Sequence, residues 1–181
     1  MTLTLTLFRH AKSGWDDSVA RDFDRPLNAR GERAAVLMGT WVKRNDITFD
    51  HVVASPAVRC IDTIDQFVKG TGERIDATWD RRIYLASSAT LMDVLRDQSD
   101  EYKSIMMVGH NPGMEDLVFD IVPDDGSSPL RDVVWEKYPT AAIARLELDI
   151  DSWADIDRKC GRLTLFIRPR NLDPELGPEE E

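Results

Sequence analysis

Short apolar segments alternate with longer amphipathic segments along most of this chain, and this alternation limits the folds it can adopt. Short apolar segments suit buried strands, and an apolar stripe at helical spacing suits a helix. The predicted strands are residues 2–8, 51–54, 105–108, 141–149 and 163–168. The predicted helices are residues 29–43, 55–69, 88–96 and a segment that begins at residue 111. This order favours an α/β fold, a three-layer α/β/α sandwich with a mostly parallel central sheet.

Capping residues predict where the helices begin and end. Asn28 is the expected N-cap of the helix over residues 29–43. Ser55 and Pro56 suit the N-cap and the first position of the next helix, which is expected to end at Gly70.

The length of 181 residues suits one domain, which we assign to residues 1–170. Residues 171–181 form an acidic tail of mostly Pro, Gly and Glu with little to bury, and we expect this tail to be mobile.

The net charge of −10, from 33 acidic and 23 basic residues, argues against nucleic acid or an anionic membrane as a partner. No segment approaches the roughly 20 apolar residues of a membrane helix, and the N-terminus alternates like a strand instead of resembling a signal peptide. We therefore expect a cytoplasmic protein, with Cys60 and Cys160 as reduced thiols. No apolar surface repeat is visible, which favours a monomer.

Three of the predicted strands end directly at polar or basic residues. Arg9-His10 follows the first strand, Ser55-Pro56-x-x-Arg59 the second, and Gly109-His110-Asn111-Pro112 the third. If these strands are parallel neighbours, their carboxyl ends share one edge of the sheet, where α/β proteins bind ligands. The arginines, histidines and helix N-termini at that edge describe a site for phosphate.

Each junction also has an ordinary interpretation as a capped helix or a simple turn. Their joint occurrence favours the functional interpretation, since two of the three histidines, His10 and His110, fall at such junctions. His51 begins a strand and is predicted to be structural.

Together these motifs resemble the histidine phosphatase superfamily, whose fold is phosphoglycerate mutase-like, and most closely its SixA-type phosphohistidine phosphatases. The resemblance runs from about residue 3 to residue 149, and the usual third residue of the first motif, glycine, is alanine here, as it often is in the short branch. The motifs are Arg9-His10-Ala11-Lys12-Ser13, Arg25-Pro26-Leu27-Asn28-x-x-Gly31, Ser55-Pro56-x-x-Arg59-x-x-x-Thr63 and Gly109-His110-Asn111-Pro112.

The resemblance implies that His10 is a nucleophile that forms a covalent phosphohistidine. Arg9 and Arg59 would clamp the phosphoryl oxygens, His110 would donate a further hydrogen bond, and no metal or cofactor would be needed. An imidazole titrates near 6.5, and neighbouring arginines disfavour its protonated form. We expect its other nitrogen to donate to a backbone carbonyl. The weaker candidates for substrate binding are Arg25, Lys12, Ser13 and Asn111.

The general acid is missing from its expected place. Larger family members that cleave alkyl phosphates present a carboxylate where this chain has Leu85. An alkoxide leaves poorly without a proton donor, whereas the imidazole of phosphohistidine leaves easily. This favours phosphohistidine as the substrate, unless Asp16, Asp17 or Asp24 supplies the proton.

Three alternatives remain open besides a phosphatase acting on a phosphorylated protein. One is a phosphomonoesterase for a small phosphorylated substrate, and another is a phosphate-binding module without turnover. A metal hydrolase that uses His10, His110 and aspartates is disfavoured because arginines flank the site. A mutase is disfavoured because the segments between the motifs are short.

Overall fold

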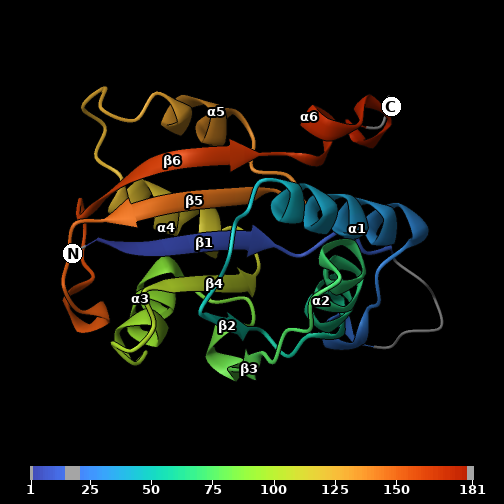
Figure 1. Ribbon diagram of the computed structural model, residues 1–181, viewed down its shortest axis with the longest axis horizontal. Helices are drawn as coiled ribbons and strands as arrows, with labels where there is room; N and C mark the ends of the chain where they lie inside the picture. Colours follow the sequence, from blue (N-terminus) through green and yellow to red (C-terminus); the bar gives the residue numbers. More distant parts are fainter. Residues whose placement is uncertain (1, 15–20, 179–181) are drawn as a thin grey trace.

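A six-stranded sheet forms the centre of the computed structural model, which describes residues 2–14 and 21–178 (Figure 1). The strand order is β3-β2-β4-β1-β5-β6. Strands β1, β2, β3 and β4 run parallel, while β5 and β6 are antiparallel to their neighbours. The strands are Leu3–Arg9 (β1), His51–Ala54 (β2), Thr78–Trp79 (β3), Ser104–Gly109 (β4), Ile143–Leu148 (β5) and Gly161–Ile167 (β6).

Helices cover both faces of this sheet, which confirms the three-layer α/β/α fold. Alternate residues of β4 show the division: Met106 and Val108 pack in the cluster with α1 and α2, while Ile105 and Met107 pack with α3 and α4. The helices are Ala29–Arg44 (α1), Val58–Thr71 (α2), Ser88–Arg96 (α3), Gly113–Ile121 (α4), Leu130–Glu136 (α5) and Pro169–Leu172 (α6).

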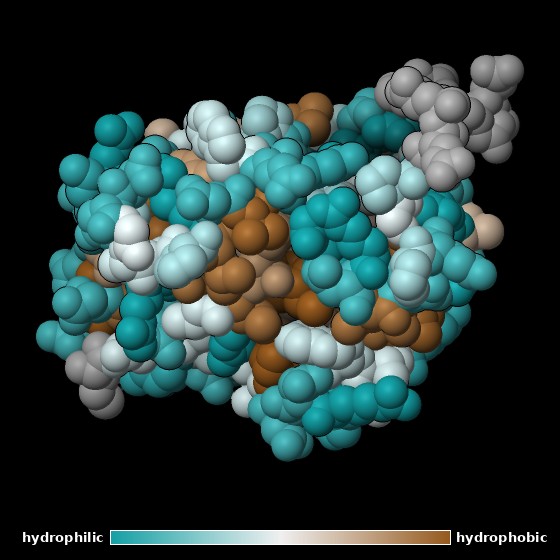
Figure 2. Space-filling model, turned by 90° about the horizontal axis from the view of Figure 1, so that it is seen from above, coloured by the Kyte–Doolittle hydropathy of each residue, from teal (hydrophilic) through white to brown (hydrophobic). Residues whose placement is uncertain are grey.

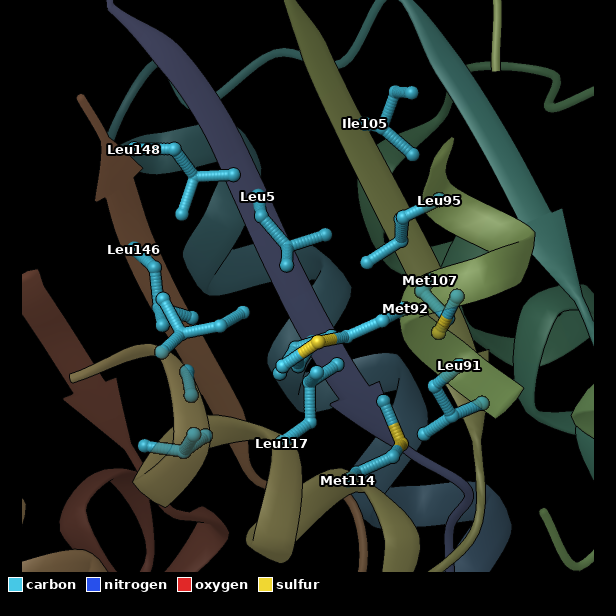
Figure 3. Close-up of a cluster of buried hydrophobic side chains, with 14 of the residues drawn as sticks. Leu5, Leu91, Met92, Leu95, Ile105, Met107, Met114, Leu117, Leu146 and Leu148 are labelled. Atoms are coloured by element: carbon cyan, nitrogen blue, oxygen red, sulfur yellow. The ribbon is translucent and has the colours of Figure 1, made fainter. Parts of the chain in front are cut away.

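The larger of the two cores lies between the sheet and helices α3 and α4 (Figure 3). Leu5 of β1, Met107 of β4 and Leu146 of β5 meet Leu95 of α3 and Leu117 of α4 there, and all five are fully buried. Burial of each such side chain stabilises the fold by about 1.5–3 kcal/mol. The sheet is therefore a rigid base for the residues at its carboxyl edge.

The helix boundaries agree with the sequence at α1 and differ at α2. The side chain of Asn28 accepts from the backbone N–H of Gly31 at 2.8 Å, as expected of an N-cap. The prediction that Ser55 caps α2 is wrong, because this helix begins at Val58 and the Ser55 hydroxyl lies 2.8 Å from a ring nitrogen of His110. The hydroxyl also accepts from the N–H of Ala57 at 3.3 Å, so it contacts the site and the residues before the helix, but no N–H of the helix itself.

Gly70 is not the end of α2, because the helix continues to Thr71 and Gly72 caps it with a φ of 70°. Gly70 instead permits the close crossing of α1 and α2. A Cβ atom on Gly70 would lie 2.1 Å from the carbonyl oxygen of Val36. Only glycine fits at such a distance.

The C-terminal segment, which the sequence predicts to be mobile, packs against the rest of the chain as far as residue 178. Leu172 and Leu176 pack against the core that α1 and α2 share with the sheet. Arg33 of α1 forms ion pairs with Asp173 and Glu175. The two leucines and the Arg33 guanidinium therefore attach a segment whose composition predicted few buried side chains. Residues 179–181 lie outside the described part of the chain.

Helix α5 is a further element that the sequence did not predict. Its seven residues bury only Val134 fully, so its apolar periodicity is weak.

Among residues 2–14 and 21–178 no helix has the length and apolarity needed to cross a membrane. Figure 2 shows a mainly hydrophilic face with an apolar band across its middle.

Candidate active site

The carboxyl ends of β1, β2 and β4 bring three distant segments together at one edge of the sheet. The three strands are adjacent and parallel, in the order β2-β4-β1. The ring centroids of His10 and His110 consequently lie 5.2 Å apart. Arg59, from the first turn of α2, lies 3.2 Å from His110 through its Nη2 atom.

His10 is held in one tautomer as a neutral ring. Its Nδ1 lies 2.7 Å from the carbonyl oxygen of Ala11. A carbonyl only accepts, so the proton is on Nδ1 and the lone pair is on Nε2. Burial is the main cause that lowers the pKa of His10 to about 3. The hydrogen bond to the Ala11 carbonyl raises this pKa, whereas the nearby His110, Arg9 and Arg59 lower it further. The ring is therefore neutral at neutral pH, with its one proton on Nδ1.

His110 is also neutral, but both of its nitrogens have partners. Its Nδ1 faces the guanidinium of Arg59, which only donates, so Nδ1 accepts this bond. Its Nε2 then donates to Ser55 Oγ at 2.8 Å. Burial, followed by the charge of Arg59, lowers the pKa of His110 to about 3. In this state the ring has no proton for a ligand, and the expected role as a donor requires Nδ1 to gain one.

Arg59 is buried, with a side chain 2% exposed, and Asp22 covers its end. Its Nη1 donates to the backbone carbonyl of Asp22 at 2.8 Å and its Nη2 to the carboxylate at 3.0 Å. The same carboxylate accepts from Tyr84 Oη at 2.6 Å and from Arg25 Nε at 3.0 Å. Burial opposes ionisation of Asp22, but these bonds outweigh it and lower its pKa to about 2.

Asp22 and Tyr84 are site residues that the sequence did not single out. Tyr84 also places its ring edge-on to His110, with centroids 5.4 Å apart. The sequence signal for them was position: Asp22 lies three residues before Arg25, a candidate for substrate binding, and Tyr84 directly precedes Leu85, where an acid was expected. Leu85 itself is 56% exposed and brings no carboxylate to the site.

The expected alternative acids do not reach the site within the described residues. Asp24 is partly exposed and pairs with Arg21 through a bond of 2.7 Å. Asp16 and Asp17 lie outside the described residues. Asp22 is thus the carboxylate that bonds to Arg59, whereas the carboxylate whose charge acts on Arg9 is that of Glu115.

The charge of Arg9 is felt by both histidines, and it contributes to lowering the pKa of each. Its Nη1 donates to the carbonyl of Tyr138 at 2.8 Å. Its Nε is buried and has no hydrogen-bond partner among the described atoms. Asn111, a predicted substrate contact, is used differently, because its amide donates to the same Tyr138 carbonyl and accepts from the N–H of Glu115.

Ser13 and Lys12 lie beside the nucleophile loop with different surroundings. The hydroxyl of Ser13 donates to the carbonyl of Pro26 at 2.6 Å and accepts from Arg25 at 3.2 Å. Ser13 therefore ties the loop to the segment that carries Arg25. Lys12 lines a neighbouring cavity together with Arg9.

Thr63 joins the loop after His10 to helix α2. Its hydroxyl accepts from the backbone N–H of Ala11 at 2.9 Å and donates to the carbonyl of Arg59 at 2.6 Å. Gly31 permits a second close approach, since a Cβ there would lie 2.1 Å from the carbonyl oxygen of Lys12. Both residues of the motifs thus fix the position of His10.

No group of three or more His, Cys, Asp or Glu side chains within residues 2–14 and 21–178 is placed to hold a metal ion. The groups that meet at the edge of the sheet are two neutral imidazoles, two arginines that face them, and Arg25 held through Asp22. Such a set binds an oxyanion, since guanidinium groups match the oxygens of phosphate.

Known proteins resemble this chain in sequence and in fold. A profile of the histidine phosphatase superfamily (branch 1) matches residues 5–83. An uncharacterised protein of Mycobacterium tuberculosis is 34% identical over 163 residues, which cover 90% of this chain and 99% of the relative. An uncharacterised protein of Mycobacterium leprae is 28% identical over 166 residues, which cover 90% and 99% of the two chains.

Solved structures give the same result. A candidate phosphohistidine phosphatase SixA from Agrobacterium tumefaciens superimposes with a TM-score of 0.76 at 29% identity, covering 92% of this chain and 98% of that one. Another, from Nakamurella multipartitia, has a TM-score of 0.80 at 25% identity, with 93% and 97% covered. The protein histidine phosphatase SixA complexed with tungstate has a TM-score of 0.76 at 22% identity, covers 94% and 100%, and shares the fold. The chain therefore belongs to the histidine phosphatase superfamily and is a phosphatase of that family.

Proposed function

We propose that this phosphatase works through a covalent phosphohistidine on His10 and that it removes phosphoryl groups from phosphohistidine on a protein. The state of the His10 ring carries the proposal. Nδ1 is occupied by the Ala11 carbonyl, burial keeps the ring neutral, and Nε2 therefore has an unshared electron pair. A neutral imidazole in a fixed tautomer is the form that attacks phosphorus.

In the first step, Nε2 of His10 bonds to phosphorus while the bond to the leaving group breaks and the leaving group takes the electron pair and a proton. Arg9 and Arg59 stabilise the charge on the phosphoryl oxygens. The dianion also draws a proton to His110, whose Nδ1 then donates instead of accepting. In the second step, water attacks the phosphorus of phospho-His10, and inorganic phosphate and neutral imidazole are formed.

The choice of phosphohistidine as substrate rests on the acid that is missing. Leu85 stands at the position expected for a carboxylate, and the pKa of Asp22 is held at about 2 by its hydrogen bonds. A carboxylate in that state has no proton to give at neutral pH. A protein phosphohistidine needs little help, because its imidazole is a good leaving group that takes a proton from solvent.

The position of Asp22 also supports one alternative, a small-molecule phosphomonoesterase. If a phosphate dianion takes over Arg59, Asp22 keeps Arg25 but loses its other cationic partner, and it becomes more basic. It would then be able to protonate an alkoxide. Under this alternative, Asp22→Asn abolishes turnover of sugar phosphates, whereas an enzyme without such an acid turns these esters over poorly from the outset.

The test is a trapped phosphoenzyme together with a substrate panel. Protein is mixed with a phosphohistidine peptide and quenched without acid, because phosphohistidine is labile to acid. We expect label on the wild type and on His51→Gln, a control in the third histidine, but none on His10→Ala. Phosphohistidine, phospholysine, phosphoserine and sugar phosphates are then compared by kcat/KM. Turnover that is independent of His10, or faster for sugar phosphates than for phosphohistidine, contradicts the proposal.

A further inference from the structure

A cavity with a volume of about 360 Å³ lies beside the candidate active site and shares Arg9 with it. Its walls come from four parts of the chain: the loop after β1, the first turn of α1, the segment before β5, and the C-terminal segment. The lining residues are Arg9, Lys12, Arg30, Lys137, Pro139, Thr140, Pro169, Arg170, Leu176, Gly177 and Pro178.

The lining of this cavity is strongly basic. Five of its residues are arginine or lysine, and none is acidic. The whole chain, in contrast, has a net charge of −10. A concentration of cations that opposes the overall charge attracts an anion locally, and the low-dielectric walls of a cavity strengthen that attraction. The distribution of charge therefore indicates a ligand with negative groups.

The C-terminal wall is anchored before any ligand arrives. Leu176 packs on the core beneath it, and the carbonyl of Gly177 accepts from Arg30. The ion pairs of Arg33 with Asp173 and Glu175 fix the turn between α6 and the end of the described chain. Because these contacts already order the wall, binding there costs little further conformational entropy.

We propose that this cavity binds the carboxylates of an acidic segment next to the phosphohistidine of a protein substrate. The inference rests on the proposed function, which places the phosphoryl group at His10. Arg9 is the last residue of β1 and directly precedes His10, so a ligand in the cavity and a phosphoryl group on His10 belong to one continuous binding surface. Pro139, Pro169 and Leu176 add apolar area for the aliphatic parts of a polypeptide.

The experiment compares two phosphohistidine peptides of equal length, one with three glutamates beside the phosphohistidine and one with three glutamines. The test variant is Lys137→Gln with Arg170→Gln. The matched control is Lys69→Gln with Arg74→Gln, which removes the same charge from α2 and the segment after it, where neither residue lines the cavity. The measured quantity is the ratio of kcat/KM for the acidic peptide to kcat/KM for the neutral one.

We expect the wild type and the control to prefer the acidic peptide by about tenfold, which corresponds to a few partly screened charge pairs. We expect the test variant to lower that ratio to about two or less, and 0.5 M salt to lower it in the wild type. A wild-type ratio near one, or an unchanged ratio in the test variant, overturns the inference while the proposed function stands.

If neither peptide is turned over, the proposed function fails, and the ligand preference of the cavity is tested by peptide binding alone. Fluorescence anisotropy with the unphosphorylated acidic peptide then decides. Weaker binding to the test variant than to the control supports an acidic ligand, and equal binding to both refutes it.

Discussion

Asp22 holds both terminal nitrogens of Arg59, accepting from Nη1 through its backbone carbonyl at 2.8 Å and from Nη2 through its carboxylate at 3.0 Å. The arginine that is proposed to clamp a phosphoryl group thus already binds an anion of its own chain. Tyr84 and Arg25 bond to the same carboxylate. A phosphoryl dianion that binds the terminal nitrogens of Arg59 must replace this carboxylate, so Asp22 competes with such a ligand.

Removal of that internal anion should tighten anion binding. We expect Asp22→Asn to lower the inhibition constant of vanadate by roughly threefold to tenfold, because a neutral amide gives up a guanidinium more easily than a carboxylate does. Asp24→Asn is the matched control, since Asp24 lies in the same turn but pairs with Arg21. Weaker inhibition of Asp22→Asn than of the control would show that Asp22 supports the anion site instead of occupying it.

The residues at the strand ends could be predicted because each is adjacent to a recognisable strand. The apolar segments before His10, Arg59 and His110 indicated parallel strands, and the structure places these strands next to one another. The ring separation of 5.2 Å follows from that arrangement. Asp22 and Tyr84 could not be predicted in the same way, because each is positioned by hydrogen bonds between loops that no local pattern encodes.

Two features that local composition did not indicate have the same physical origin. The sequence around Ser55 and Pro56 has the composition of a helix start, but the Ser55 hydroxyl is needed by His110, fifty-five residues away. The C-terminal segment has the composition of a mobile tail, but Leu176 packs against the core between the sheet and helices α1 and α2. In both cases a tertiary contact outweighs local propensity, and a single sequence shows no sign of that contact.

The planar fork of Arg59 should matter beyond its charge. We expect Arg59→Ala to lose at least about 100-fold in kcat/KM, since a positioned donor to transition-state charge contributes about 2.7–4 kcal/mol. Arg59→Lys should recover only part of this loss, because an ammonium group cannot bind two oxygens side by side.

Thermal unfolding of both Arg59 variants separates a binding defect from a folding defect. Arg82→Ala is the control, because its guanidinium pairs with Asp80 and Asp97 at the surface. A loss below tenfold in a folded Arg59→Ala protein would contradict the clamp.

Thr63 should act by positioning the nucleophile loop. Thr63→Val keeps the shape but leaves the N–H of Ala11 and the carbonyl of Arg59 without the partner they have now. An unsatisfied buried group costs about 1–3 kcal/mol, so we expect a lower free energy of unfolding and a kcat reduced by about tenfold. Thr40→Val removes a hydroxyl that bonds only to the Val36 carbonyl within α1, and it should change neither quantity much. Equal effects of the two substitutions would argue against a positioning role.

The two site histidines should make the protein less stable in mild acid. The pKa values of His10 and His110 are lowered to about 3, mainly by burial, whereas an unfolded histidine titrates near 6.5. Between these values the unfolded chain binds more protons than the folded one, so the free energy of unfolding rises with pH. The stabilisation is complete above pH 6.5 and is lost as the pH falls toward 3.

Urea unfolding between pH 7.5 and 5.5 measures this effect above the range in which most carboxylates titrate. We expect up to about two protons to be taken up by these rings on unfolding near pH 5.5, each equivalent to about 1.4 kcal/mol per pH unit. His51, whose pKa burial also lowers, adds to the slope, so variants are needed to separate the contributions. His110→Gln should reduce the slope by about one proton. A slope that His110→Gln leaves unchanged would mean that this ring is protonated in the folded protein, which the acceptor role of its Nδ1 toward Arg59 does not allow.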